Sequence, residues 1–205
     1  MQATNIALTA LFNKTLSKSM SYDEYVTLTA NLTAQHKSTG NTPNDEDLAN
    51  YTMLNDRRLK RWNKTLKLDQ EIIDIAANQA KNLVWLVLSE SWCGDAAHNI
   101  PVLNKIAMLN DKIDLRIAIR NDNLDLMNEF LTNGAAAIPK LIAYDKDTKK
   151  IAYEWGPRPT EATVLVADYK ALHGKLTLEF KEDLQRWYNK NKGQAVINDF
   201  KKLLV

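Results

Sequence analysis

The chain has little cysteine, glycine or proline. Its 205 residues include one cysteine, six glycines and five prolines. A single cysteine, Cys93, excludes an intramolecular disulfide and agrees with a reducing compartment. No window approaches the run of about 20 apolar residues that a membrane-spanning helix needs. The N-terminal segment MQATNIALTALFNKTLSKSM lacks the basic region and long apolar core of a signal peptide. We therefore expect a cytoplasmic protein that does not associate with a membrane.

The chain also has almost no excess of charge of either sign. The 27 basic and 25 acidic residues leave a net charge of +2, so the composition does not indicate a nucleic-acid partner. One cysteine and three scattered histidines do not have the spacing of metal ligands. We expect neither a metal nor another cofactor. A hydrophobic content of 45% is ordinary for a globular protein, and the length allows one large domain or a smaller one with extensions.

The first 80 residues have the pattern of helices. Ser21 and Glu24 have the spacing of a capping box. Asn44 is the expected N-cap of the next helix, and Asp69 that of a further one. The basic run at residues 57–61 is interpreted as a solvated helix face, because isolated charge runs usually lie in solvent.

From Leu83 the pattern changes to alternating strands and helices. The predicted elements are a strand at 83–89, a helix at 95–109, a strand at 113–119, a helix at 123–132, strands at 139–145 and 150–154, and helices at 160–172, 176–191 and after Gly193. Strands joined by a helix are expected to be parallel, and strands joined by a tight turn antiparallel.

The sequence thus predicts an α/β fold with a mixed sheet in the order β-α-β-α-β-β-α. We expect residues 1–80 to form a helical N-terminal extension packed on the core. Residues 81–174 would form the α/β domain, and residues 175–205 a helical C-terminal extension.

This order resembles the thioredoxin fold, and three local features sharpen the resemblance. The W-C-G at residues 92–94 resembles the start of the W-C-G-P-C active-site turn and follows an apolar strand, as in that family. Pro101 lies eight residues after Cys93, where the family has a helix-kinking proline. The dipeptide at residues 138–139 resembles the family's cis-proline, which lies against the active-site cysteine. The resemblance covers about residues 83–172.

The active-site turn departs from the family pattern and reads W-C-G-D-A. Asp95 replaces the proline, and Ala96 replaces the cysteine that resolves a mixed disulfide in the family. The buried acid that the family often carries six residues before the first cysteine is Val87 here. A two-cysteine cycle within one chain is therefore excluded, and Cys93 remains as the candidate catalytic residue.

The reactivity of Cys93 depends on two opposing effects. Free N–H groups and the helix dipole at the start of a helix favour a thiolate and lower its pKa. Asp95 is a nearby like charge and opposes this. Each effect is on the order of 1 kcal/mol, so we expect the two to nearly cancel. His98 lies five residues after Cys93, beyond one helical turn, and is interpreted as ordinary helix surface rather than a general base.

The expected partner-binding residues surround the thiol. They are Trp92, Gly94, Asp95, Ile138 and Pro139. Trp92 has two interpretations, either a hydrophobic lip beside the thiol or a side chain packed on the sheet. In thioredoxin-like proteins, the backbone just before the cis-proline pairs with an extended peptide or a thiol tripeptide.

Two basic residues near this site also have open interpretations. Lys140 either favours an acidic ligand or is an outward-facing lysine at the start of a strand. Arg158 either holds a carboxylate through a bidentate contact or belongs to a rigid segment that positions the next helix.

The resemblance implies a choice between functions. The favoured hypothesis is monothiol thiol-disulfide exchange, in which Cys93 attacks a mixed disulfide and an external thiol releases it. Its partner would be a protein or a low-molecular-weight thiol or disulfide. The alternative is a non-catalytic protein-binding or adaptor domain, with the N-terminal helices as the docking surface. A third possibility is a redox sensor that is modified at Cys93. The sequence leaves open whether the protein is an enzyme.

Overall fold

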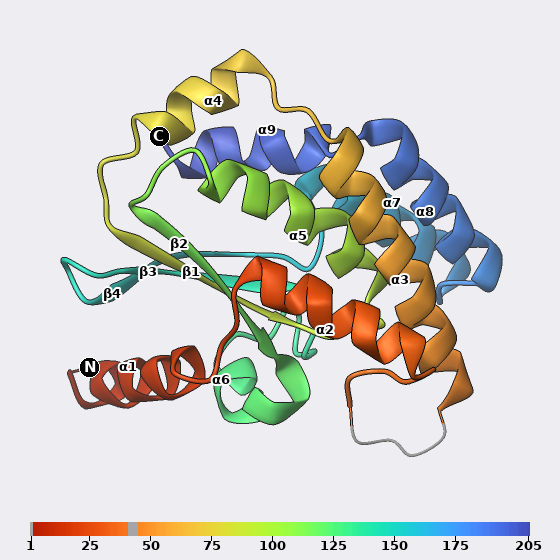
Figure 1. The fold of residues 1–205 in the computed structure, drawn as a ribbon, viewed down its shortest axis with the longest axis horizontal. Coiled ribbons are helices and arrows are strands. Elements are labelled where there is room, and N and C mark those ends of the chain that lie inside the picture. Colours follow the sequence, from red (N-terminus) through yellow and green to blue (C-terminus); the bar gives the residue numbers. More distant parts are fainter. Residues whose placement is uncertain (1, 41–44) are drawn as a thin grey trace.

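The computed structural model describes residues 2–40 and 45–205 of the chain. Its helices and strands (Figure 1) are α1 (Gln2–Leu16), α2 (Tyr22–Ala34), α3 (Glu46–Thr65), α4 (Gln70–Ala77), β1 (Leu83–Ser89), α5 (Gly94–Ala107), β2 (Ile113–Ile119), the 3₁₀ helix η1 (Arg120–Asn123), α6 (Leu124–Asn128), β3 (Lys140–Asp145), β4 (Lys150–Trp155), α7 (Thr160–His173), α8 (Leu178–Asn191) and α9 (Gln194–Leu203).

Side chains at the helix starts explain where several helices begin. Ser21 and Glu24 form the predicted capping box of α2, in which each side chain accepts a hydrogen bond from the other residue's backbone N–H. Asp69 caps α4 as predicted. The N-cap of α3 is Asp45, whose carboxylate accepts a backbone N–H from the first turn. Asn44, the predicted cap, lies outside the described residues.

The four strands form one mixed sheet in the order β2-β1-β3-β4. Strand β1 runs parallel to β2 and antiparallel to β3, and β4 runs antiparallel to β3. These directions confirm the predicted mixed sheet. All seven residues of the inner strand β1 are buried, which explains its nearly unbroken apolar sequence.

Helices cover both faces of this sheet. Phe12 of α1 stacks on Tyr144 of β3, with ring centroids 4.8 Å apart. On the other face, Phe200 of α9 meets Trp85 of β1 at 4.9 Å. Figure 1 shows α5 and α9 on one side of the sheet and α1 and α6 on the other. The N-terminal helices share the main core with the sheet, whereas the division of the chain near residues 80 and 174 remains a prediction.

Helix α8 belongs mainly to a second, smaller core. Its buried residues Leu184 and Tyr188 cluster with Ala162 and Val166 of α7. This small cluster lies beside the start of α5, so polar side chains of α8 reach the candidate site.

Within the described residues, no helix is long and apolar enough to cross a membrane.

Candidate thiol site

Cys93 lies between the end of β1 and the first turn of α5, where it is the N-cap residue. Its thiol donates a hydrogen bond to the backbone carbonyl oxygen of Ile138, with 3.3 Å between sulfur and oxygen. The Ile138–Pro139 peptide bond is cis. The fold therefore brings together the two segments that carry the family resemblance, although they lie 45 residues apart in the chain.

The thiol is held in its protonated form. Cys93 is buried, with 8% of its surface exposed. Burial raises the pKa of the thiol to about 12, and the charge of Asp95 adds to this shift. The backbone N–H groups of Ala96 and Asp95 and the charge of Arg158 oppose it. The expectation that opposing effects nearly cancel is wrong, because removal from water outweighs the stabilisation that the start of a helix offers.

Asp95 is bound from two sides by its own chain. One carboxylate oxygen lies 2.7 Å from the guanidinium of Arg158. The other accepts a hydrogen bond from the Tyr188 hydroxyl at 3.0 Å. Burial raises the pKa of Asp95, while the charge of Arg158 and the Tyr188 hydrogen bond oppose the shift. The carboxylate that Arg158 binds therefore belongs to Asp95 of the same chain and not to a ligand.

His98 is buried, so its interpretation as helix surface is wrong. Only 2% of its surface is exposed. Its Nδ1 accepts a hydrogen bond from the Trp62 indole at 3.1 Å, so its Nε2–H is free to donate to the Gln185 side-chain oxygen at 3.0 Å. The ring stacks on Tyr188 at a centroid distance of 4.6 Å. Burial lowers the pKa of His98 to about 3, and the imidazole thus links α3 to α8 as a neutral group.

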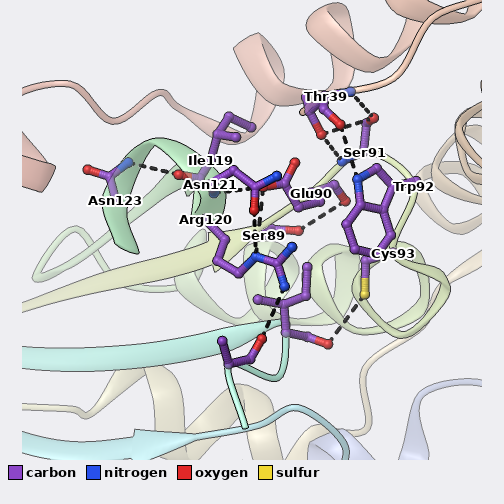
Figure 2. Close-up of polar contacts among 12 residues, drawn as sticks. Thr39, Ser89, Glu90, Ser91, Trp92, Cys93, Ile119, Arg120, Asn121 and Asn123 are labelled. Atoms are coloured by element: carbon purple, nitrogen blue, oxygen red, sulfur yellow. Dashed lines mark hydrogen bonds and ion pairs between the residues drawn. The ribbon is translucent and has the colours of Figure 1, made fainter. Parts of the chain in front are cut away.

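Trp92 and Gly94 precede and follow Cys93 in the chain, and both lie next to segments that are distant in sequence. The Trp92 indole is half-buried and donates a hydrogen bond to the backbone oxygen of Thr39 at 3.1 Å (Figure 2). Trp92 is also one of the partly buried side chains packed against the main core, and both interpretations of its role stay open. A Cβ placed on Gly94 would lie 3.3 Å from the Gln185 amide oxygen and 3.5 Å from the Arg58 guanidinium. Side chains of α3 and α8 therefore both pack next to the start of α5.

Ser91 and Glu90, next to the thiol in the chain, belong to a network of buried hydrogen bonds that no sequence pattern predicted. The Ser91 hydroxyl lies 2.9 Å from both the backbone nitrogen of Thr39 and the hydroxyl of Thr52. Glu90 is fully buried and accepts the backbone N–H of Asn121 at 2.8 Å, as Figure 2 shows. Burial raises the pKa of Glu90. This network ties the active-site turn to the N-terminal helices and to η1.

Two interpretations of basic residues need correction. Lys140 does not face outward, because it is 4% exposed and its ammonium lies 2.7 Å from the carboxylate of Glu154. In the basic run of α3, Arg57, Lys60 and Arg61 are exposed as expected. Arg58 is the exception: it is half-buried and turns toward the start of α5.

Chemically, this arrangement provides one shielded thiol, and Cys93 is the single cysteine of the sequence. In the described part of the chain, His, Cys, Asp and Glu side chains form no group of three or more suited to a metal ion. No sequence feature indicated that Gln185 and Tyr188 contact the site, because both belong to an ordinary amphipathic helix whose partner the local pattern does not specify.

The mixed sheet, the cysteine at the start of α5 and the cis-proline beside it define a thioredoxin-like protein. A family model described as Thioredoxin matches residues 41–170, and the chain belongs to the thioredoxin family. None of the curated proteins compared with the chain matches it.

Two solved structures share the fold over nearly their whole length. One is the 1.5 Å crystal structure of a protein of unknown function from Pseudomonas aeruginosa, with a TM-score of 0.63 and 16% identity over 94% of this chain and 95% of that one. The other is an HIV epitope-scaffold, with a TM-score of 0.55 and 18% identity over 90% of this chain and 97% of that one. At these identities the likeness shows the fold alone.

Proposed function

We propose that the chain is a thioredoxin-family protein-binding domain that works without thiol turnover. The observation that supports this proposal is the resting state of Cys93. The sulfur is buried and protonated, and it donates to the carbonyl of Ile138. That carbonyl belongs to the backbone just before the cis-proline, where thioredoxin-like proteins pair with an extended peptide. The nucleophile and the carbonyl oxygen of this docking edge are therefore bonded to each other.

The expected reaction rate supports the same conclusion. With a pKa of about 12, only about one thiol in 10⁵ is ionised at pH 7, against about one in 30 for an ordinary cysteine. A more basic thiolate is a better nucleophile, which recovers a factor of about 40. From its pKa alone, Cys93 is then expected to react with a disulfide about 100-fold more slowly than a free cysteine. The restricted access of a disulfide to the buried sulfur would slow the reaction further.

The proposed partner is a protein, bound outside the thiol edge. The N-terminal helical region is the proposed docking surface, since Thr52 of α3 and Thr39 in the connection between α2 and α3 both contact the active-site turn. The proposal includes a reducing, cytoplasmic location, and it includes neither a nucleic acid nor a membrane as partner.

Monothiol exchange is the second candidate, and one contact favours it. The 3.3 Å contact between Cys93 and Ile138 aligns the sulfur with the edge where the family's nucleophile meets its substrate. In the first step, the Cys93 thiolate would attack one sulfur of a disulfide, form a new S–S bond and release the other sulfur as a thiolate. An external thiolate would then attack the mixed disulfide and release Cys93, with no net oxidation of the protein.

One experiment separates the two candidates. The rate at which Cys93 reacts with 5,5′-dithiobis(2-nitrobenzoate) is measured across pH in the folded chain and in the urea-unfolded chain, which is the matched control. A binding domain predicts a folded-state rate about 100-fold or more below the unfolded rate at pH 7. A folded rate equal to or above the unfolded one, with catalysed reduction of a glutathione mixed disulfide that Cys93→Ser abolishes, would establish exchange instead.

A further inference from the structure

A pocket of about 550 Å³ is lined by residues from the end of α3 and from the connection between α8 and α9, and its lining does not include Cys93. Figure 1 shows these elements. Its lining includes the cationic side chains of Arg61, Lys67 and Lys192, the amides of Asn189 and Asn191, and Trp62. This volume falls within the usual range of small-molecule sites, about 300–1,000 Å³.

The lining is positively charged although the chain as a whole is nearly neutral. Among the nine described residues that line the pocket, three are cationic and none is acidic. Lys67 and Lys192 form no ion pair within residues 2–40 and 45–205. The neighbouring carboxylate of Asp69 accepts a hydrogen bond from Gln194 but is already paired with Lys201 at 3.1 Å. The positive charge in the pocket is therefore not neutralised by the chain itself.

Parts of the pocket are held in place before any ligand arrives. The Arg61 guanidinium lies 4.9 Å from the centre of the Trp62 ring and donates to the Asn189 side chain at 2.6 Å. Lys192 and Gly193 both have positive φ, of 55° and 83°. A Cβ on Gly193 would lie 2.9 Å from a methyl of Val102, so this turn is pressed against α5. A preorganised wall reduces the entropy lost on binding.

We propose that this pocket binds a phosphorylated small molecule. A phosphate monoester carries up to two negative charges on three oxygens, which suits one guanidinium held by Asn189 and two ammonium groups that form no ion pair among the described residues. The volume exceeds what inorganic phosphate needs and leaves room for a small organic group beside the phosphate. The pocket is separate from the thiol site, because its lining contains neither Cys93 nor the cis-proline segment. Its α3 residues belong to the N-terminal helices, but the inference does not rest on the proposed function.

The test uses the full chain and glucose 6-phosphate as the probe, measured by isothermal titration calorimetry. Glucose and inorganic phosphate are titrated in parallel. The test variant is the double substitution Lys67→Gln/Lys192→Gln. The matched control is Lys64→Gln/Lys190→Gln, which removes the same charge from exposed lysines that do not line the pocket. All four lysines are exposed, so both variants are expected to fold, and circular dichroism checks this.

We expect saturable binding of glucose 6-phosphate that weakens about tenfold or more in the test variant and by less than about twofold in the control. Four results would overturn the proposal. They are an absence of saturable binding, binding of glucose as tight as that of its phosphate, binding of inorganic phosphate as tight as that of the sugar phosphate, or equal weakening in both variants. The last result would indicate diffuse attraction rather than a pocket.

Discussion

Replacing Asp95 with asparagine tests how the thiol is kept protonated. The substitution preserves the size of the side chain but removes the negative charge two residues from Cys93, which is the second cause of the raised pKa after burial. Because burial remains, we expect the pKa of Cys93 to fall by about one unit. The thiolate fraction then rises about tenfold at neutral pH, and its lower nucleophilicity cancels a factor of about three. The reaction with a disulfide reporter should be about threefold faster.

The same substitution should also weaken the fold. The Asp95 carboxylate is bound by Arg158 at 2.7 Å and by Tyr188 at 3.0 Å. Removing one partner of a buried ion pair costs about 3–5 kcal/mol. The Arg158 side chain is 24% exposed, so water recovers part of this cost, and we expect a loss of about 2 kcal/mol in the free energy of unfolding in urea.

Tyr188→Phe is the matched control for this experiment. It removes the hydrogen bond to Asp95 but keeps the carboxylate charge, so it should cost about 1 kcal/mol of stability without lowering the pKa of Cys93. The measurement is the reporter rate against pH under native conditions. An unchanged thiol pKa in Asp95→Asn, or an equal gain in rate in Tyr188→Phe, would refute the reasoning. Loosening of α8, rather than the charge, would then control the thiol.

Three further predictions concern stability. The pKa of His98 falls from 6.5 to about 3 on folding, so only the unfolded chain takes up a proton as the pH drops from 6.5 toward 3. Stability should therefore fall by up to about 1.4 kcal/mol per pH unit in this window, and urea titrations of His98→Gln should lack this contribution. An equal slope in both proteins would contradict the prediction. Folding raises the pKa of Cys93 to about 12, so its contribution to stability is complete below the pKa of the unfolded thiol and is lost as the pH rises from there toward 12. Stability between pH 9 and 10 should fall more steeply in the wild type than in Cys93→Ser, and parallel curves would count against a protonated thiol. Gly156→Ala would place a Cβ in steric clash with the Pro139 carbonyl oxygen at a φ of 114°, and should cost about 3 kcal/mol or more in thermal unfolding. Gly174→Ala, at a φ of 73° with no atom within 4 Å, should cost only about 1 kcal/mol, and similar losses in the two variants would disprove the close contact at Gly156.

The strands and most of the helices could be predicted from local patterns. The boundaries of β1 and β2 match the prediction to the residue, because each strand is an apolar or alternating run that ends at turn residues. The expected helix at 123–132 is shorter and begins with a 3₁₀ turn, since α6 covers only Leu124–Asn128. Helix ends depend on contacts beyond the local pattern, and they are the least certain part of such a prediction.

The electrostatics of the site could not be predicted in this way. His98 and Lys140 are polar residues in positions that read as surface, yet each is buried with a partner from another segment. The shift in the pKa of Cys93 follows the same logic. A helix start predicts a lowered pKa, but the burial of the sulfur depends on segments distant in sequence, such as the backbone at Ile138 that packs against it.

The amino-acid sequence alone determined the order of strands and helices, the thioredoxin resemblance and the loss of the second cysteine. Each of these depends on spacing along the chain or on the identity of one residue. The tertiary structure alone decided that Asp95 is paired, that His98 is neutral and that the thiol is protonated. These properties depend on desolvation and on charges brought together by folding, and neither is encoded in the neighbours of a residue along the chain.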